Sequence, residues 1–277
     1  MKYILTILSF FLLASCSTKN NETKNVVTVS ITPQKYFAEQ LLPDDYEVNV
    51  MVPPGSSPAT YEPTPRQLQL LSKSAAYVRI GAIEFEQVWM NKIRDNNPDL
   101  EIIHSDKSVE YLKEGQERDP HIWTSPQRVK TLVSNMAERF KSLFPEESTT
   151  IESNREDLMH RINEVHKTIK NQLKPHEGRA FIIYHPALAY FANDYQLEQI
   201  AIEHHGKEPS AHDMEHIMKK GQDMNIKTVF IQKQFDRQSA VTIAEEIDAK
   251  VITINPLSEK WDEAMLDIAS KLKSSFN

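Results

Sequence analysis

The chain has 277 residues, of which 40% are hydrophobic and 26% are charged, a composition typical of a folded globular protein. Its formal net charge of −7 argues against a nucleic-acid partner, because such partners favour a basic surface. The single Cys excludes an internal disulfide framework, and the six Gly form neither a G-x-G-x-x-G motif nor a phosphate-binding loop. The ten His are the unusual feature of this acidic chain.

The N-terminus is typical of an export signal. Lys2 is the only charge before residue 19, and the apolar run at residues 4–13 is too short for a bilayer core of roughly 30 Å. This run ends at Leu13-Ala14-Ser15-Cys16, which resembles a bacterial lipoprotein box. We therefore expect a signal peptide at 1–15, a lipid on Cys16 and a polar tether over 16–25. The protein would be lipid-anchored in the bacterial cell envelope, on the extracytoplasmic side; the alternative is an ordinary signal peptide with an incidental Cys.

Alternating strand and helix patterns follow this leader. Runs rich in β-branched and aromatic residues predict strands at 26–31, 46–52, 77–81, 101–104, 179–184, 197–202, 228–232 and 250–254. Segments with helical period lie at 34–42, 65–74, 84–96, 187–194, 209–224, 237–248 and 258–273. Such alternation predicts an α/β fold with two lobes of parallel-rich sheet flanked by helices.

One long helix is predicted between the two halves, over residues 148–173. Its apolar side chains share one helical face; they are Ile151, Leu158, Ile162, Val165, Ile169 and Leu173. Pro145 stops the preceding helix, and Ser148 or Thr149 can cap the new one. We expect an N-terminal lobe at 26–147, a rigid linking helix at 148–174 and a C-terminal lobe at 175–277.

The binding site is predicted where strand ends of the two lobes face each other. In α/β proteins, ligands bind beyond the carboxyl ends of parallel strands. Four segments qualify: residues 53–65, the loop through Asp119-Pro120-His121, His185-Pro186 and Asn255-Pro256. Proline stiffens the chain in these segments, beside a potential ligand.

Five stretches, taken in order, carry a more specific pattern than any one of them alone. They are residues 53–65 (PPGSSPATYEPTP), Asp119-Pro120-His121-Ile122-Trp123, Tyr184-His185-Pro186-Ala187-Leu188-Ala189-Tyr190-Phe191, Gly206-Lys207-Glu208-Pro209-Ser210 and Asn255-Pro256-Leu257. Together they resemble the metal-binding lipoproteins and periplasmic receptors of zinc and manganese ABC importers, the ZnuA-like family. The resemblance spans nearly the whole mature chain. One family feature is missing, since residues 113–118 read KEGQER where the family has a His-rich acidic loop.

The resemblance also implies metal ligands. In the family, four loops supply His, His, His or Glu, and Asp; the second position matches His121 and the third matches His185. The first falls at Ala59, which has no ligand atom, and the fourth falls at Asn255, whose amide oxygen is a weak donor. Two imidazoles with Asn255 and a water would form a four-coordinate site of zinc-like geometry.

Three acidic residues are further candidates. Glu62 lies three residues past Ala59 and reaches the site if that loop is reshaped. Glu203, with His204 and His205, follows the sixth predicted strand. Glu208 is expected behind the ligands, where it accepts from a His N–H or caps the helix that begins near Pro209.

We therefore expect a monomeric, non-enzymatic receptor that captures Zn²⁺, or Mn²⁺ as the second choice, and delivers it to an ABC transporter permease. The alternative is a metal-independent adhesin or structural lipoprotein on the same fold. A distant third comes from His212-Asp213-Met214-Glu215-His216, which spells the H-x-x-E-H motif of some metalloproteases. We interpret it as surface helix, because Ser210 and Asp213 form a capping box that leaves His212 in an exposed first turn.

Overall fold

The computed structural model describes residues 25–114, 117–203, 207, 209–235 and 238–277, and it contains two parallel sheets. The first has strand order β2-β1-β3-β4 and the second β10-β9-β7-β8. In each sheet the first strand of its half pairs with the second and third, and the fourth lies outside the third. The two halves therefore share one topology, and the predicted α/β fold with two parallel-rich sheets flanked by helices is confirmed.

The strands of both sheets are short. They are β1 (Val26–Val29), β2 (Glu47–Val50), β3 (Ala76–Arg79), β4 (Glu101–His104), β7 (Ala180–Ile183), β8 (Glu198–Ala201), β9 (Thr228–Gln232) and β10 (Lys250–Ile254). The central strands β7 and β9 are buried throughout, as expected for parallel strands covered by helices on both faces. All eight coincide with a predicted strand to within two residues at either end.

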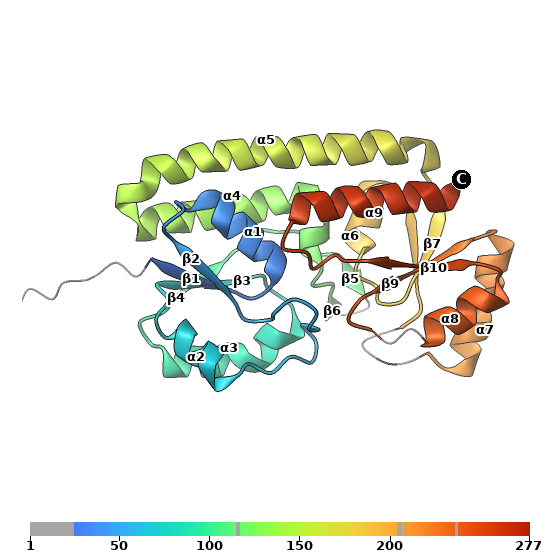
Figure 1. The fold of residues 1–277 in the computed structure, drawn as a ribbon, viewed down its shortest axis with the longest axis horizontal. Helices are drawn as coiled ribbons and strands as arrows, with labels where there is room; N and C mark the ends of the chain where they lie inside the picture. Colours follow the sequence, from blue (N-terminus) through green and yellow to red (C-terminus); the bar gives the residue numbers. More distant parts are fainter. Residues whose placement is uncertain (1–24, 115–116, 204–206, 208, 236–237) are drawn as a thin grey trace, which may run out of the picture.

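Helices cover both faces of each sheet (Figure 1). They are α1 (Thr32–Leu41), α2 (Pro65–Leu71), α3 (Glu84–Asn96), α4 (Pro126–Leu143), α5 (Ser148–Leu173), α6 (Ala189–Asp194), α7 (Ala211–Asp223), α8 (Gln238–Glu246) and α9 (Trp261–Phe276). Local sequence sets several starts: Thr64 and Ser210 accept a backbone N–H in capping boxes, and Ser125 does so ahead of Pro126.

Two short strands and the helix α4 were absent from the predicted strand and helix ranges. The two-residue strands β5 (Lys113–Glu114) and β6 (Glu117–Arg118) pair antiparallel in the segment that replaces the family's His-rich loop. Strands this short carry too few residues for an alternating pattern to be recognised. The helix α4 was expected only as the helix that Pro145 ends, and its start at Pro126 was not assigned.

The helix α5 runs across both sheets, with α4 and α9 packed beneath it (Figure 1). Its 26 residues give a rod of about 39 Å at 1.5 Å per residue. All six apolar residues of the predicted stripe are buried. One continuous hydrophobic core contains this stripe together with side chains of the first sheet, such as Val27, and of the second, such as Phe230. The two lobes are therefore held by shared packing as well as by a helix.

Two tryptophans fasten the lobes to each other. The Trp261 indole Nε1–H donates to the Trp123 carbonyl at 2.7 Å, and the Trp123 indole Nε1–H donates to the Pro256 carbonyl at 2.9 Å. Trp261 also contacts Phe37 of α1 edge-to-face, with ring centroids 5.3 Å apart. Since both indoles are almost fully buried, these contacts leave little freedom for the lobes to swing apart.

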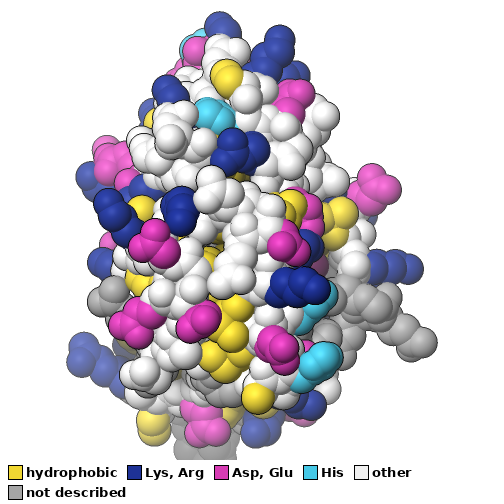
Figure 2. Space-filling model, turned by 90° about the vertical axis from the view of Figure 1, so that its right-hand side faces the viewer, with side chains coloured by type: hydrophobic (Ala, Val, Ile, Leu, Met, Phe, Trp, Pro, Cys, Tyr) yellow, Lys and Arg dark blue, Asp and Glu magenta, His cyan; other side chains and the backbone are white. Residues whose placement is uncertain are grey.

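One end of the molecule has a surface of mixed charge with some apolar side chains between the charged ones (Figure 2). The end of the molecule shown in Figure 2 carries interspersed Lys, Arg, Asp and Glu side chains, with a few histidines reaching solvent. Within the described ranges, no helix combines the length and the apolar content that crossing a bilayer requires. Cys16 and the expected signal peptide lie outside the described residues.

Replacing Trp261 with Ala should lower the free energy of unfolding by about 3–5 kcal/mol, because it removes a buried indole and its hydrogen bond. Val88→Ala is the control, since Val88 is 60% exposed and its loss should change stability by less than about 0.5 kcal/mol. Urea titration measures both. Equal effects of the two substitutions would contradict a shared core at Trp261.

Candidate metal site

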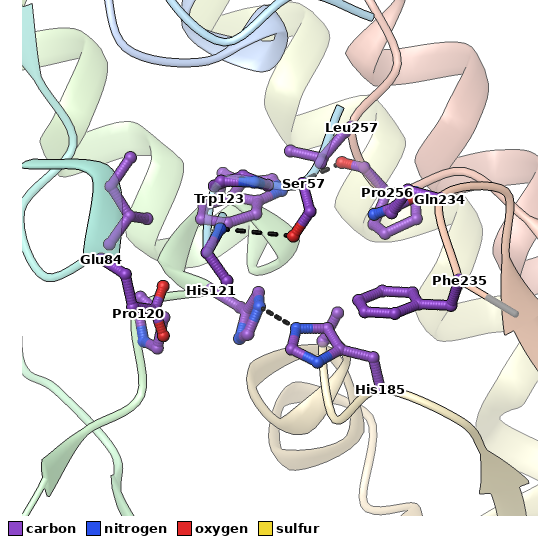
Figure 3. Close-up of a pocket in the computed structure, with 14 residues that line it drawn as sticks. Ser57, Glu84, Pro120, His121, Trp123, His185, Gln234, Phe235, Pro256 and Leu257 are labelled. Carbon is purple, nitrogen blue, oxygen red and sulfur yellow. Dashed lines mark hydrogen bonds between the residues drawn. The ribbon is translucent and has the colours of Figure 1, made fainter. Parts of the chain in front are cut away.

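The two matched histidines come from different lobes and meet (Figure 3). His121 lies just before the 3₁₀ turn Ile122–Thr124, and His185 follows the carboxyl end of β7. Their Nε2 atoms are 3.0 Å apart, and the rings lie at 74° to each other. Both side chains are largely buried, with 12% and 21% exposed, so the meeting point is shielded from bulk water yet open to the cavity.

A carboxylate lies behind each imidazole. Asp119 Oδ1 is 2.8 Å from Nδ1 of His121, and Glu203 Oε1 is 2.9 Å from Nδ1 of His185. A carboxylate at Nδ1 favours the tautomer with hydrogen on that nitrogen, which leaves the Nε2 lone pair directed into the cavity. This arrangement is the one that metal-binding histidines commonly use to fix their ring and raise their basicity.

The short distance between the two Nε2 atoms places two potential metal-binding nitrogens face to face. Two lone pairs facing each other at 3.0 Å repel, and a shared proton removes that repulsion. A metal ion between the rings removes it equally well. Two nitrogens bound to one tetrahedral Zn²⁺ at about 2.0–2.1 Å lie about 3.3 Å apart, so the rings need to separate by only a few tenths of an ångström.

Local contacts hold His185 in this position. The side chain of the buried Gln232, the last residue of β9, donates to the His185 carbonyl at 2.8 Å and accepts from its N–H at 3.4 Å. Phe235 stacks on the imidazole with centroids 4.8 Å apart and 26° between planes. Burial lowers the pKa of His185 below its ordinary value of 6.5, which outweighs the opposing effect of Glu203. The imidazole is therefore the neutral, ligating form at pH 7.

The loop that carries His121 is also held in place by hydrogen bonds. Asp119 Oδ1 also accepts the backbone N–H of His121 at 2.8 Å, which closes a tight turn across Pro120. The Tyr190 hydroxyl donates to the Asp119 carbonyl at 2.7 Å and accepts from Leu112 N at 3.0 Å. Tyr190 belongs to α6 of the second half, so the second lobe positions the loop that carries His121.

The remaining candidates lie in different places. Ala59 lines the cavity and offers only a methyl group. Asn255 uses its Oδ1 to accept Leu257 N at 3.2 Å, and Glu62 is exposed. Neither Asn255 nor Glu62 is among the described residues that line the cavity. Glu203 faces Nδ1 of His185, on the side away from His121. Glu208, His204 and His205 lie outside the described residues.

Sequence reasoning missed four residues near the histidines. Asp119 was quoted only as part of a motif, and Glu84, Gln232 and Phe235 were not considered for the site. Glu84, Gln232 and Phe235 all lie at or shortly after the carboxyl end of a strand, β3 or β9. In α/β proteins ligands bind beyond the carboxyl ends of parallel strands, and the loops after β3 and β9 meet this criterion as well. That criterion is the sequence signal for Glu84, Gln232 and Phe235.

The H-x-x-E-H segment forms a surface helix, as predicted. Ser210 Oγ accepts from Asp213 N at 3.2 Å in the capping box of α7, and both His212 and His216 are exposed. Neither lines the cavity that contains His121 and His185, among the residues described there. Across the described ranges, no group of three or more His, Cys, Asp or Glu side chains is already arranged to hold a metal.

The comparisons with known proteins decide the family. The family model described as zinc-uptake complex component A, periplasmic, matches residues 27–273. The chain belongs to this family. Its members are metal-binding components of uptake systems and not enzymes, so both the resemblance and the expected absence of catalysis are confirmed. This ZnuA-family chain is thus a metal-binding receptor of an ABC uptake system that works outside the cytoplasm.

Individual relatives support the assignment. The high-affinity zinc uptake system protein ZnuA of Bacillus subtilis is 23% identical over 276 residues, covering 90% of this chain and 85% of that protein. The zinc-binding lipoprotein AdcA of Streptococcus pneumoniae is 23% identical and covers 94% of this chain, which spans only 55% of that longer protein. A crystal structure of ZnuA superposes with a TM-score of 0.88 at 36% identity, covering 91% of this chain and 99% of that one.

Removing either carboxylate behind the histidines should weaken metal binding without abolishing it. For Asp119→Asn and Glu203→Gln we expect about 10–100-fold lower Zn²⁺ affinity, because each imidazole loses its orientation and basicity. Calorimetry measures this, with Glu215→Gln on the exposed face of α7 as the control. Unchanged affinity in both variants would contradict the orienting role.

Proposed function

We propose that this chain captures Zn²⁺ between His121 and His185 and delivers it to an ABC transporter permease. The observation that carries the proposal is the approach of the two Nε2 atoms to 3.0 Å, each imidazole backed by a carboxylate. The ion is cargo, so the mechanism is binding and release, with no bond of a substrate broken. The ion would replace the hydrogen bond between the two imidazoles.

Zinc is favoured over manganese by the ligand chemistry. Imidazole nitrogen suits Zn²⁺, whereas Mn²⁺ prefers a larger shell of oxygen donors. Structures with this fold include a zinc-bound deletion mutant of ZnuA, 36% identical to this chain, and a manganese-bound protein of Candidatus Liberibacter asiaticus, 18% identical. A site built from two buried histidines supports zinc as the physiological cargo and leaves Mn²⁺ as the weaker competitor.

The route of delivery follows from the chain's architecture. Cys16 would carry the lipid, and residues 16–25 would tether the receptor near its permease. We assign residues 26–147 and 175–277 to the two lobes and 148–174 to the linking helix. The receptor would act as a monomer, and the outer rims of both lobes would contact the permease. The shared core and α5 support a receptor that changes shape little on loading.

Single substitutions of the histidines test the proposal. His121→Ala and His185→Ala should each reduce Zn²⁺ affinity by more than about 100-fold, because either one leaves a single imidazole in the cavity. The loss is measured by calorimetry and metal analysis on a soluble form of the protein whose chain starts after the tether. The matched control is His212→Ala combined with His216→Ala, which removes two exposed histidines and should leave affinity unchanged.

The outcomes separate the candidate functions. If neither His121→Ala nor His185→Ala changes binding of any transition metal, the proposal fails. Loss of a metal-dependent peptidase activity in the double control variant would revive the protease alternative. A metal-independent adhesin would bind no Zn²⁺ at all. This alternative has a structural basis, because the laminin-binding protein of Streptococcus agalactiae has the same fold, at 20% identity and a TM-score of 0.83.

Acid should weaken zinc binding. Because burial lowers the pKa of His185, protons begin to compete for this ligand only as the pH falls below about 6.5. Below that pH, affinity should fall by about tenfold per unit for each proton displaced. The groups that face His185 are Glu203, which opposes the shift, His121, which adds to it, and Glu84, which opposes it. Competition titrations between pH 7.5 and 5 measure the effect, and a constant affinity over that range would count against ligation by histidine.

A further inference from the structure

Among the described residues that line the cavity, one carboxylate has neither a hydrogen-bond nor an ion-pair partner. Three acidic side chains line it together with the histidines: Glu84, Asp119 and Glu203. Asp119 and Glu203 are bound to the Nδ1 atoms of His121 and His185. Glu84 makes no hydrogen bond or ion pair within the described part of the chain, and its side chain is exposed to the cavity. Glu84 is thus the acidic group at the cavity whose oxygens are available to a ligand.

The backbone around Glu84 is firmly positioned. Glu84 is the first residue of α3, and the loop from β3 to α3 is gathered around the buried side chain of Glu86. Glu86 accepts from Ile80 N at 2.6 Å and Gly81 N at 2.9 Å, and from the Arg79 guanidinium at 3.2 Å. This loop has no spare room, because a Cβ at Gly81 would lie 2.1 Å from the Tyr111 hydroxyl. The place of Glu84 at the rim is therefore set by the fold.

The same loop lies against the segment that carries Ala59. Phe85 N donates to the Pro58 carbonyl at 3.0 Å, so the residue after Glu84 is bonded to the residue before Ala59. Both Glu84 and Ala59 line the cavity beside His121 and His185. Figure 3 shows the Glu84 side chain beside Pro120, at the His121 end of the histidine pair. The carboxylate thus enters from the lobe and the side of the cavity where Ala59 provides only a methyl group.

We propose that Glu84 is the metal ligand that the N-terminal lobe supplies in place of Ala59, completing a set of two histidines and one glutamate. The proposal rests on the function proposed above and adds a residue that no motif of the family assigns. Two histidines, one glutamate and a water form a recognised zinc coordination set. The carboxylate also brings a negative charge to a site whose other ligands are neutral, which offsets part of the charge of the ion.

On this proposal, loading involves a movement of the Glu84 side chain. Among the described residues, no three His, Cys, Asp or Glu side chains are already placed to hold a metal. The Glu84 side chain is exposed and can adopt several rotamers. Its carboxylate would turn inward as the ion enters between the two Nε2 atoms, while the backbone stays in place. Such a movement closes the site without a swing of the lobes, which agrees with their common core.

Glu84→Gln tests the assignment in the same soluble form of the receptor, which contains both lobes and the linking helix. It should lower Zn²⁺ affinity by more than about tenfold, since the loss of residues that only support a ligand already costs 10–100-fold. It should also change the visible absorption spectrum of bound Co²⁺, because that spectrum reports the atoms bound to the ion. The matched control is Glu62→Gln, an exposed glutamate on the segment of Ala59, which should change neither readout.

The outcomes distinguish this inference from the proposed function. If His121→Ala and His185→Ala abolish binding while Glu84→Gln leaves affinity and the Co²⁺ spectrum unchanged, Glu84 is no ligand and the proposed function stands. A reduced affinity with an unchanged spectrum also overturns ligation, since it indicates an effect of charge through space. If the histidine variants bind as the native chain does, the proposed function itself fails.

A rescue experiment tests whether Glu84 and Ala59 serve the same position. Adding Ala59→His to the Glu84→Gln variant places an imidazole on the neighbouring loop of the same lobe. We expect Zn²⁺ affinity to recover toward the native value. No recovery in a folded double variant would contradict the exchange of one ligand position for the other.

Discussion

The 3.0 Å approach of His121 Nε2 to His185 Nε2 is the constraint on which the rest of the structure depends. Two ring nitrogens from separate lobes are brought this close because each ring is held from behind. Asp119 and Glu203 hold the rings, and Gln232 and Tyr190 hold the backbones that carry them. The site is thus a pair of imidazoles from two lobes, each positioned by its own carboxylate.

Much of the fold could be predicted from the sequence, because its signals are local. The strand runs, the apolar stripe of α5 and the proline before it each act within a few residues. The hairpin β5–β6 could not be predicted, since two-residue strands form only where the tertiary structure brings them together. The meeting of His121 and His185 was indicated by motif order and the rule of strand ends, and by no local pattern.

The rest of the site depends on pairings across long stretches of chain. Glu203 follows His185 by 18 residues, and Tyr190 reaches Asp119 across 71. No spacing in the sequence distinguishes a carboxylate that orients an imidazole from one that faces the ion. Glu203 shows this, because it was expected as a ligand and lies instead at Nδ1 of His185. Only the fold tells which side of a ring a carboxylate approaches.

The core that Trp123 and Trp261 help to form also affects how the protein unfolds and is degraded. Because side chains of both sheets belong to one apolar cluster, each half contributes to the stability of the other, and the second half has a further cluster of its own. Damage to one lobe, by truncation or by proteolysis, would therefore disrupt the ion site and weaken the other lobe. A bound ion, in turn, protects the entire polypeptide from unfolding, so a starved receptor is also the one most easily degraded.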